Sequence, residues 1–279
     1  MIGTYNQACY GVVDGNVFDG GYNLRYTSGV EVWSIPPGSE TFSFSNNLIS
    51  AGSGNSQRTG ARFAINTPCA CTTPATQFIF AHNVVYARSV GFVGNDSTWL
   101  MNNSLNYSGR VVNNVFFGNF GQRMLSLNGG SLEAYQNNLV ITDPNVGSPK
   151  MALYNNNGTP IFDMATLETK ICDGTLYGTA YWRATGNQAV SVTPATLFVN
   201  PPTASDVALD DLLARDLHIK SGQAATLAFG LDTGSSVCGG VTGSAAACTG
   251  SGTNSCGNIT KDRDGVTRPA VPAVGAYEP

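Results

Sequence analysis

One short pattern of polar and apolar residues recurs along the first half of the chain. Each copy is an asparagine followed by mostly apolar residues, and the copies are GNVFDG (15–20), NNLISA (46–51), HNVVYA (82–87), NNVFFG (113–118) and NNLVIT (137–142). The equivalent asparagines are Asn16, Asn47, Asn83, Asn114 and Asn138, separated by 31, 36, 31 and 24 residues. Repeats of this length indicate stacked structural units whose turns absorb the variation in length.

Two further β-like stretches accompany the copies. TFSFS, QFIFA, RVV and SLEAY precede them, and GVEVW, ARFAI, VGFVG and MLSL follow. All have strand length and lie between Gly, Asn, Ser or Pro residues. Three short strands per turn predict an all-β fold, a single-stranded right-handed parallel β-helix. We expect residues 1–145 to form its coils, and residues 146–279 to form the last coil or coils and an irregular C-terminal capping region of the same domain.

The repeated asparagines are expected to form a column. Asparagine tolerates the left-handed backbone conformation at a tight bend, and its amide can bond to the equivalent amide one coil above and below. His82 stands where other copies have Asn46, Asn113 or Asn137, so we interpret it as a member of a polar column rather than a catalytic base. The apolar residues after the asparagines are expected to stack inside the coils: Val17, Leu48, Val84, Val115 and Leu139.

Composition supports strands and narrows the function. Only 11% of residues are charged, against roughly 25% in an average soluble protein. The abundant Gly, Asn, Ser and Thr compete with helical hydrogen bonding and favour turns. The net charge of -4 argues against nucleic acid as a partner, because nucleic-acid binding needs a basic surface, and it leaves glycans open.

Seven cysteines suggest an oxidising environment. They lack paired CxxC spacing, and only His82 and His218 could complete a zinc site, so disulfides are the better interpretation. The sequence contains no run of about 18 apolar residues, so no membrane-spanning helix is predicted. We therefore expect an extracellular or cell-surface protein with no cofactor. Calcium remains an option, although no dense acidic cluster indicates it.

Three blocks near the C-terminus carry a family resemblance: LFVNPP from 197, DLHIKSGQAATLAFG from 216 and DRDGVTRPAVPAVGAYEP from 262. Together with the asparagine repeats, they resemble the right-handed parallel β-helix superfamily of pectate-lyase-like proteins. The blocks are similar to the closing D-x-D-G-x-x-R-P and G-A-Y-E segment of bacterial secreted and surface members. The resemblance implies architecture, because that superfamily includes lyases, hydrolases, epimerases, adhesins and phage spikes.

The N-terminus departs from this resemblance. Superfamily members usually begin with a segment that covers the first coil, whereas here YGVVDGNVFDGG starts at residue 10. An uncovered coil end exposes unpaired strand edges. This predicts self-association through the N-terminal coil or a missing upstream segment.

An arginine series follows the repeat. Arg25, Arg58, Arg88 and Arg123 are 33, 30 and 35 residues apart, and Arg62 and Arg110 could widen the stripe. Guanidinium groups in a row could bind the carboxylates or sulfates of an acidic polysaccharide. The alternative is that each arginine caps turn carbonyls or pairs with a nearby acid. Exposed aromatic residues could stack on sugar rings, the candidates being Tyr22, Tyr26, Trp33, Tyr86, Trp99 and Tyr107.

Catalysis is left open. Uronate elimination needs a base near C5 of the sugar, and because no lysine precedes Lys150, Arg58 or Arg88 would have to serve. Glycoside hydrolysis needs facing carboxylates, but Asp210 and Asp211 are expected to cap a short helix or lie in a loop. The leading hypothesis is polysaccharide binding, with lyase activity as an option. The alternative is a non-enzymatic adhesin, spike or fibre subunit that self-assembles.

Overall fold

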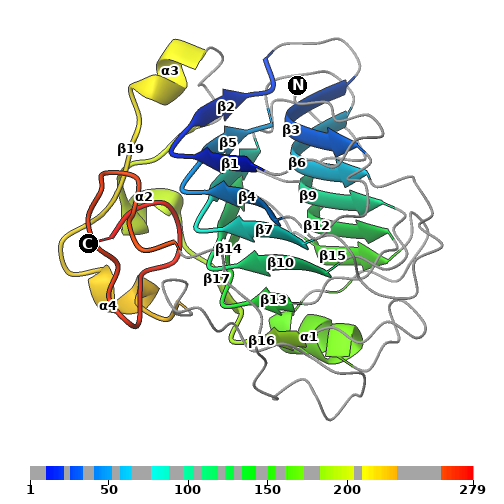
Figure 1. Cartoon of the computed structure of the whole chain (residues 1–279). Helices are drawn as coiled ribbons and strands as arrows, with labels where there is room; N and C mark the ends of the chain where they lie inside the picture. Colours follow the sequence, from blue (N-terminus) through cyan, green and yellow to red (C-terminus); the bar gives the residue numbers. More distant parts are fainter. Residues whose placement is uncertain are drawn as a thin grey trace.

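The computed structural model describes residues 11–21, 26–33, 41–51, 57–64, 77–87, 97–102, 108–118, 123–128, 134–142, 150–154, 161, 163–172, 183–203, 209–230 and 259–278. The strands of this part of the chain form three parallel sheets and one antiparallel pair. Successive strands pass from sheet A to sheet B to sheet C, and the chain then returns to sheet A beside its previous strand (Figure 1). We call each set of consecutive strands a rung; the described rungs each contribute one strand to sheets A and B, and all but the last contribute one to sheet C.

The strands of each sheet are three apart in sequence. Sheet A contains β1 (Gly11–Asp14), β4 (Thr41–Ser45), β7 (Gln77–Ala81), β10 (Ser108–Val112), β13 (Ala134–Gln136) and β16 (Arg183–Thr185). Sheet B contains β2 (Val17–Asp19), β5 (Leu48–Ser50), β8 (Val84–Ala87), β11 (Val115–Gly118), β14 (Leu139–Thr142) and β17 (Gln188–Val190). Sheet C contains β3 (Tyr26–Trp33), β6 (Gln57–Ala64), β9 (Ser97–Asn102), β12 (Arg123–Asn128) and β15 (Lys150–Tyr154).

The register places equivalent repeat residues side by side. Leu48 pairs with Val17 and with Val84, and Val115 pairs with Val84 and with Leu139. The predicted stacking of the asparagine repeats is therefore confirmed. A sixth rung, which the sequence pattern did not reveal, follows at GNQAV, with Asn187 49 residues after Asn138. The strand expected at 90–94 lies outside the described residues.

The bend between sheets A and B has the same conformation in every rung. Asn46, His82, Asn113 and Asn137 have φ angles of 52° to 57°, and glycine occupies the same position in the first and last rungs, as Gly15 and Gly186. We call these six residues the corner column. Left-handed backbone favours Gly and Asn, which explains the residue preceding each repeated asparagine.

The C-terminal segment, which we define as residues 191–203, 209–230 and 259–278, packs along sheet B. It contains α2 (Pro194–Leu197), β18 (Phe198–Asn200), α3 (Leu209–Leu213), β19 (Asp216–Ile219) and α4 (Ala224–Leu227), with β18 and β19 antiparallel. Leu48, Val84, Val115 and Leu139 share one buried cluster with its apolar side chains, so the prediction that these residues stack inside the coils is wrong. Their strand neighbours on the opposite face, such as Ile49 and Phe116, are also fully buried.

The predicted fold class, an all-β right-handed parallel β-helix with an irregular C-terminal capping region, is wrong. The described residues contain four helices beside two parallel sheets of six strands and one of five, a pattern like that of an α/β fold. The C-terminal segment contains regular elements and lies against the side of the stack rather than over its last coil (Figure 1). The prediction used the average composition of the chain, in which Gly, Asn, Ser and Thr disfavour helices. Whether a helix forms depends instead on the local sequence of each segment.

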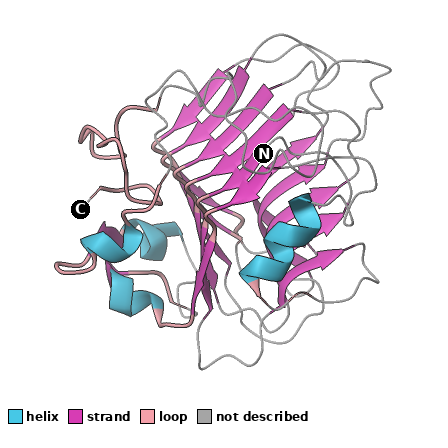
Figure 2. Cartoon of the chain, turned by 90° about the horizontal axis from the view of Figure 1, so that it is seen from below, coloured by secondary structure: helices cyan, strands magenta, loops and turns pink. Residues whose placement is uncertain are grey.

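Helix α1 (Met164–Cys172) shows this local effect. Its sequence MATLETKIC contains good helix formers, and Asp163 accepts a hydrogen bond from the backbone N–H of Thr166 at 2.7 Å, as an N-cap does. Met164 and Leu167 are buried. The helix contacts β15 and β16 and lies across that end of the stack (Figure 2).

Candidate functional site

A ladder of asparagine side chains runs through the described rungs between sheets A and B. We call it the asparagine ladder, and its members are Asn16, Asn47, Asn83, Asn114, Asn138 and Asn187. In every member after Asn16, Oδ1 accepts two hydrogen bonds from the asparagine of the preceding rung, one from the backbone N–H and one from Nδ2, at 2.9 to 3.3 Å. The predicted asparagine column is confirmed, and its buried members have a structural role.

The corner column faces the C-terminal segment instead. Asn46 Nδ2 donates to the Lys261 carbonyl at 3.0 Å, Asn137 Nδ2 donates to the Phe229 carbonyl at 2.6 Å, and the Asn113 carbonyl accepts from Gly275 N at 2.8 Å. The two neighbouring asparagines of a repeat therefore have different roles. The first fixes the bend and binds the C-terminal segment, whereas the second builds the ladder.

His82 is a buried member of the corner column. Asn113 Nδ2 lies 3.0 Å from His82 Nε2, and because an amide nitrogen can only donate, Nε2 accepts and the ring proton lies on Nδ1. Burial, followed by the positive charge of Arg268, lowers the pKa of His82 well below its usual value. The neutral ring has a structural role, as the sequence predicted.

The C-terminal motif residues form a buried polar cluster that fastens the C-terminal segment to the stack. Arg268 pairs with Glu278, and its Nη2 also donates to Asn46 Oδ1 at 2.7 Å. Asp262 Oδ1 accepts the Val266 N–H at 2.7 Å, and Oδ2 accepts the Glu278 N–H at 2.9 Å. Burial lowers the pKa of Arg268 and raises that of Glu278. The motif that carries the family resemblance is thus structural in this chain.

Gly275 in this motif has a steric reason. Its φ is 92°, and an added Cβ would lie 3.0 Å from Val115 Cγ2. The backbone must approach sheet B closely here, because the Gly275 N–H bonds to the Asn113 carbonyl. Only glycine combines this conformation with this contact.

A second polar cluster lies at the surface of the C-terminal segment. His218 Nδ1 is 2.5 Å from Asp216 Oδ1, and Nε2 is 2.6 Å from Asp264 Oδ2. Burial lowers the pKa of His218, but the hydrogen bonds and charges of the two aspartates outweigh burial and raise it above its usual value. Ionised carboxylates only accept, so both ring nitrogens donate and the imidazolium has no lone pair for a metal or substrate proton. The cluster joins β19 to the turn at 262–265.

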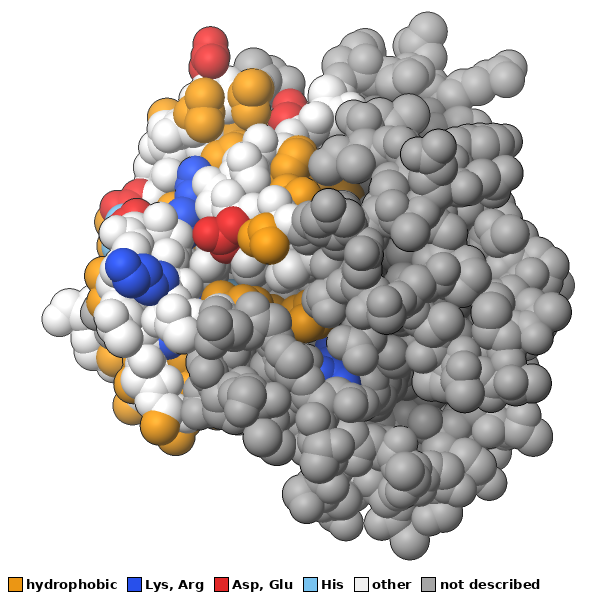
Figure 3. Space-filling model, in the orientation of Figure 1, with side chains coloured by type: hydrophobic (Ala, Val, Ile, Leu, Met, Phe, Trp, Pro, Cys, Tyr) orange, Lys and Arg blue, Asp and Glu red, His pale blue; other side chains and the backbone are white. Residues whose placement is uncertain are grey.

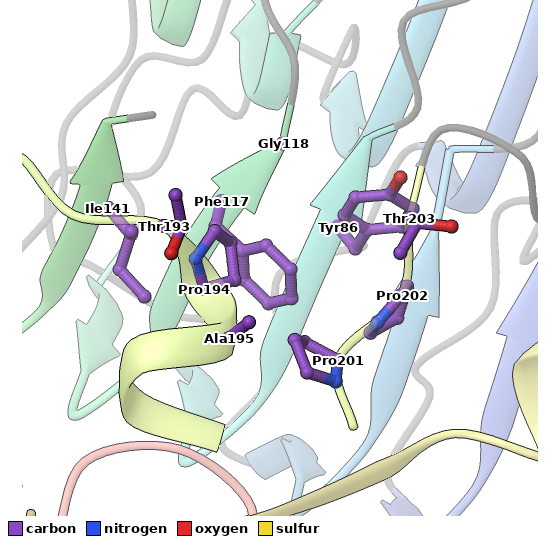
Figure 4. A pocket seen from close by; sticks show the side chains of 10 residues that line it. All are labelled: Tyr86, Phe117, Gly118, Ile141, Thr193, Pro194, Ala195, Pro201, Pro202 and Thr203. Atoms are coloured by element: carbon purple, nitrogen blue, oxygen red, sulfur yellow. The ribbon is translucent and has the colours of Figure 1, made fainter. Parts of the chain in front are cut away.

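An apolar cavity of about 190 Å³ lies between sheet B and the C-terminal segment (Figure 4). Tyr86, Phe117 and Ile141 line it from the strands, and α2 and Pro201 to Thr203 line it from the other side. Its lining contains no charged side chain, so the cavity does not suit an acidic sugar. Tyr86, predicted as an exposed sugar-stacking residue, is buried here.

A small group of apolar side chains is exposed near α3. Val199, Leu209 and Leu213 are exposed, and Figure 3 shows apolar side chains gathered over this part of the described face. Asp210 and Asp211 lie in the first turn of α3, as predicted, where carboxylates favour a helix N-terminus. Exposed apolar residues are ordinary on protein surfaces, so we assign no site to this group.

The predicted arginine series is only partly described. Arg58 lies on β6 and Arg123 on β12, both in sheet C, whereas Arg25 and Arg88 lie outside the described residues. Arg62 is four positions from Arg58 on β6. Arg123 pairs in register with Lys150, a basic residue that the repeat pattern did not single out. Arg110 is buried, so the prediction that it widens an exposed stripe is wrong.

Within the described ranges, no three His, Cys, Asp or Glu side chains are arranged to hold a metal ion. No helix in the same ranges is long and apolar enough to cross a membrane. Comparison with protein families, curated proteins and solved structures finds no match to this chain.

Proposed function

We propose that the protein binds an extended acidic polysaccharide along sheet C. One observation carries the proposal. The strands of sheet C contain Arg58, Arg62, Arg123 and Lys150 but a single acid, Glu31, in a chain whose net charge is -4. Sheet B contains no basic residue in its strands, and the C-terminal segment packs against it.

The spacing of the strands suits a linear polymer. Neighbouring strands of a sheet lie about 4.8 Å apart, so Arg58 and Arg123, separated by β9, are on strands about 10 Å apart. Lys150 is on the next strand, whereas Arg62 is the register partner of Glu31. The register places Arg123 level with Ser97 and Thr59, one position from Arg58, so Arg123 and Lys150 share a row of the sheet whereas Arg58 and Arg62 belong to the alternate rows. A chain of uronate or sulfated sugars crossing the strands would therefore meet Arg123 and Lys150 on neighbouring rungs. Arginine can bind such planar anions through two parallel hydrogen bonds.

Binding is tested by isothermal titration with polygalacturonate, with dextran as the neutral control. We expect the double variant Arg123→Ala/Lys150→Ala to bind about tenfold more weakly, because each charge contact with the polymer is worth up to about 1 kcal/mol. Added salt should weaken binding to the wild-type protein. The matched control is Lys261→Ala, which removes an exposed positive charge from the C-terminal segment. Equal affinity of the double variant and this control would exclude the proposal.

Lyase activity is the catalytic version of this proposal. Elimination removes the proton at C5 and breaks the glycosidic bond at C4, which leaves an unsaturated uronate that absorbs ultraviolet light. Arg58 is the candidate base position on sheet C. Binding of polygalacturonate without a rise in absorbance would identify a binding protein rather than a lyase.

A further inference from the structure

The asparagine ladder has a direction. In each of its five inter-rung links, the donors belong to the earlier rung and the acceptor oxygen belongs to the later one. One end of the ladder must therefore finish on unused donors and the other on an unused acceptor. The structure treats these two ends differently.

The donor end is closed by helix α1. Glu168 Oε1 accepts both the backbone N–H and Nδ2 of Asn187 at 2.8 Å. This single oxygen takes the same two hydrogen bonds that a ladder Oδ1 takes in every other link. Glu168 therefore occupies the place of the asparagine oxygen of a further rung.

The acceptor end, at Asn16, lacks such a partner. No described donor reaches Asn16 Oδ1, and Asn16 is exposed. In the five later rungs, Nδ2 also donates to a backbone carbonyl of the preceding rung, such as that of Val13 for Asn47. Asn16 Nδ2 instead bonds to Asp14 O of its own rung, at 2.8 Å. The first rung thus has the hydrogen-bonding groups for a rung above it.

We propose that the end formed by β1, β2 and β3 is an interaction surface for the opposite end of a second copy of this chain, and that α1 blocks that opposite end. In the joined state, Asn187 of one copy donates to Asn16 Oδ1 of the next, and the strands continue in parallel. Among the described strands, sheets A, B and C finish at this end on β1, β2 and β3, and the end strand of a sheet is where a strand of another chain can be added.

The direction of the ladder also selects the orientation of the second copy. Two Asn16 ends brought together would oppose one amide oxygen with another, whereas an Asn187 end brings two N–H donors to one oxygen. A head-to-tail contact of this kind repeats in one direction and can extend into a filament. Glu168 competes for the same donors, so self-association requires α1 to move away. This inference does not depend on glycan binding.

The test is sedimentation velocity over a concentration series with the full chain. Glu168→Ala frees the donors of Asn187, and we expect it to self-associate about tenfold more tightly than the wild-type protein. Leu167→Ala loosens the packing of α1 and retains Glu168, so it provides a second way to open this end. In both variants, hydrogen exchange at Gly11–Asp14 should slow as concentration rises, because these strands become paired.

Adding Asn16→Leu to either variant should abolish association. The matched control is Asn200→Leu, which replaces an exposed asparagine on β18 and should leave association intact. Three outcomes would overturn the proposal: folded opened variants that stay monomeric, association that persists with Asn16→Leu, or association accompanied by loss of the circular dichroism of the folded chain.

Discussion

The two ends of the asparagine ladder both finish on an asparagine, one on its N–H donors and the other on its acceptor oxygen, and they differ in environment. At one end, Asn187 is buried and both its N–H donors bond to Glu168. At the other, Asn16 is exposed and its Oδ1 meets no described donor. Buried donors need a protein partner, whereas an exposed oxygen can bond to water. A protein partner is therefore obligatory only at the buried end.

The largest effect should come from breaking the ladder between its ends. Asn114→Leu removes the oxygen that accepts Asn83 N and Nδ2, and the amide that donates to Asn138 Oδ1. These groups are fully buried, so we expect a loss of about 4 kcal/mol in the free energy of unfolding, measured by urea denaturation. Asn16→Leu at the exposed end should cost less than about 1 kcal/mol. Equal losses would show that the ladder contributes no more in the interior than at its end.

An intermediate effect is expected at the buried end. Glu168→Ala leaves two donors of Asn187 unpaired and should lower the free energy of unfolding by about 2 kcal/mol. Glu168→Gln keeps an acceptor oxygen and should cost about 1 kcal/mol or less. Thermal or urea unfolding of both variants measures this difference, with Thr169→Ala as the control at the next, exposed helix position. If Glu168→Gln and Glu168→Ala lowered the free energy of unfolding equally, the acceptor oxygen at position 168 would not be what stabilises this end of the ladder.

The smallest effect should appear at the surface cluster of the C-terminal segment. Because the folded state raises the pKa of His218, the cluster stabilises the fold fully below the unfolded pKa of about 6.5. That contribution is lost as pH rises through the folded pKa. Exposure limits it to a few tenths of a kcal/mol.

Urea denaturation at pH 6 and pH 9 measures the contribution of His218. The difference in stability between the two pH values should shrink in His218→Gln, which cannot carry the charge. An unchanged pH dependence in this variant would disprove the assignment.

The sequence alone determined the repeat and the asparagine column. Asn47, Asn83, Asn114 and Asn138 recur with strand-length neighbours, and this local pattern predicted their alignment and the structural role of His82. Local sequence also predicted that Asp210 and Asp211 would not form a facing pair. Each copy is a short local pattern, and its recurrence along the chain can be recognised without knowing which residues are in contact.

The sequence pattern did not reveal several features that depend on distant contacts. Asn187 follows Asn138 by 49 residues, beyond the length of the other repeats. Lys150 was linked to Arg123 only by the register of β12 and β15. The functional interpretation of sheet C therefore needed the strand pairing.

Tertiary structure decided which apolar face is covered and how the ladder ends. Both faces of sheet B carry apolar residues, so alternation could not show that Leu48, Val84, Val115 and Leu139 face the C-terminal segment. The helices overturned the all-β prediction because local helix formers were hidden by the average composition. Glu168 completes the ladder only because α1 folds back onto Asn187, and no sequence spacing encodes that contact.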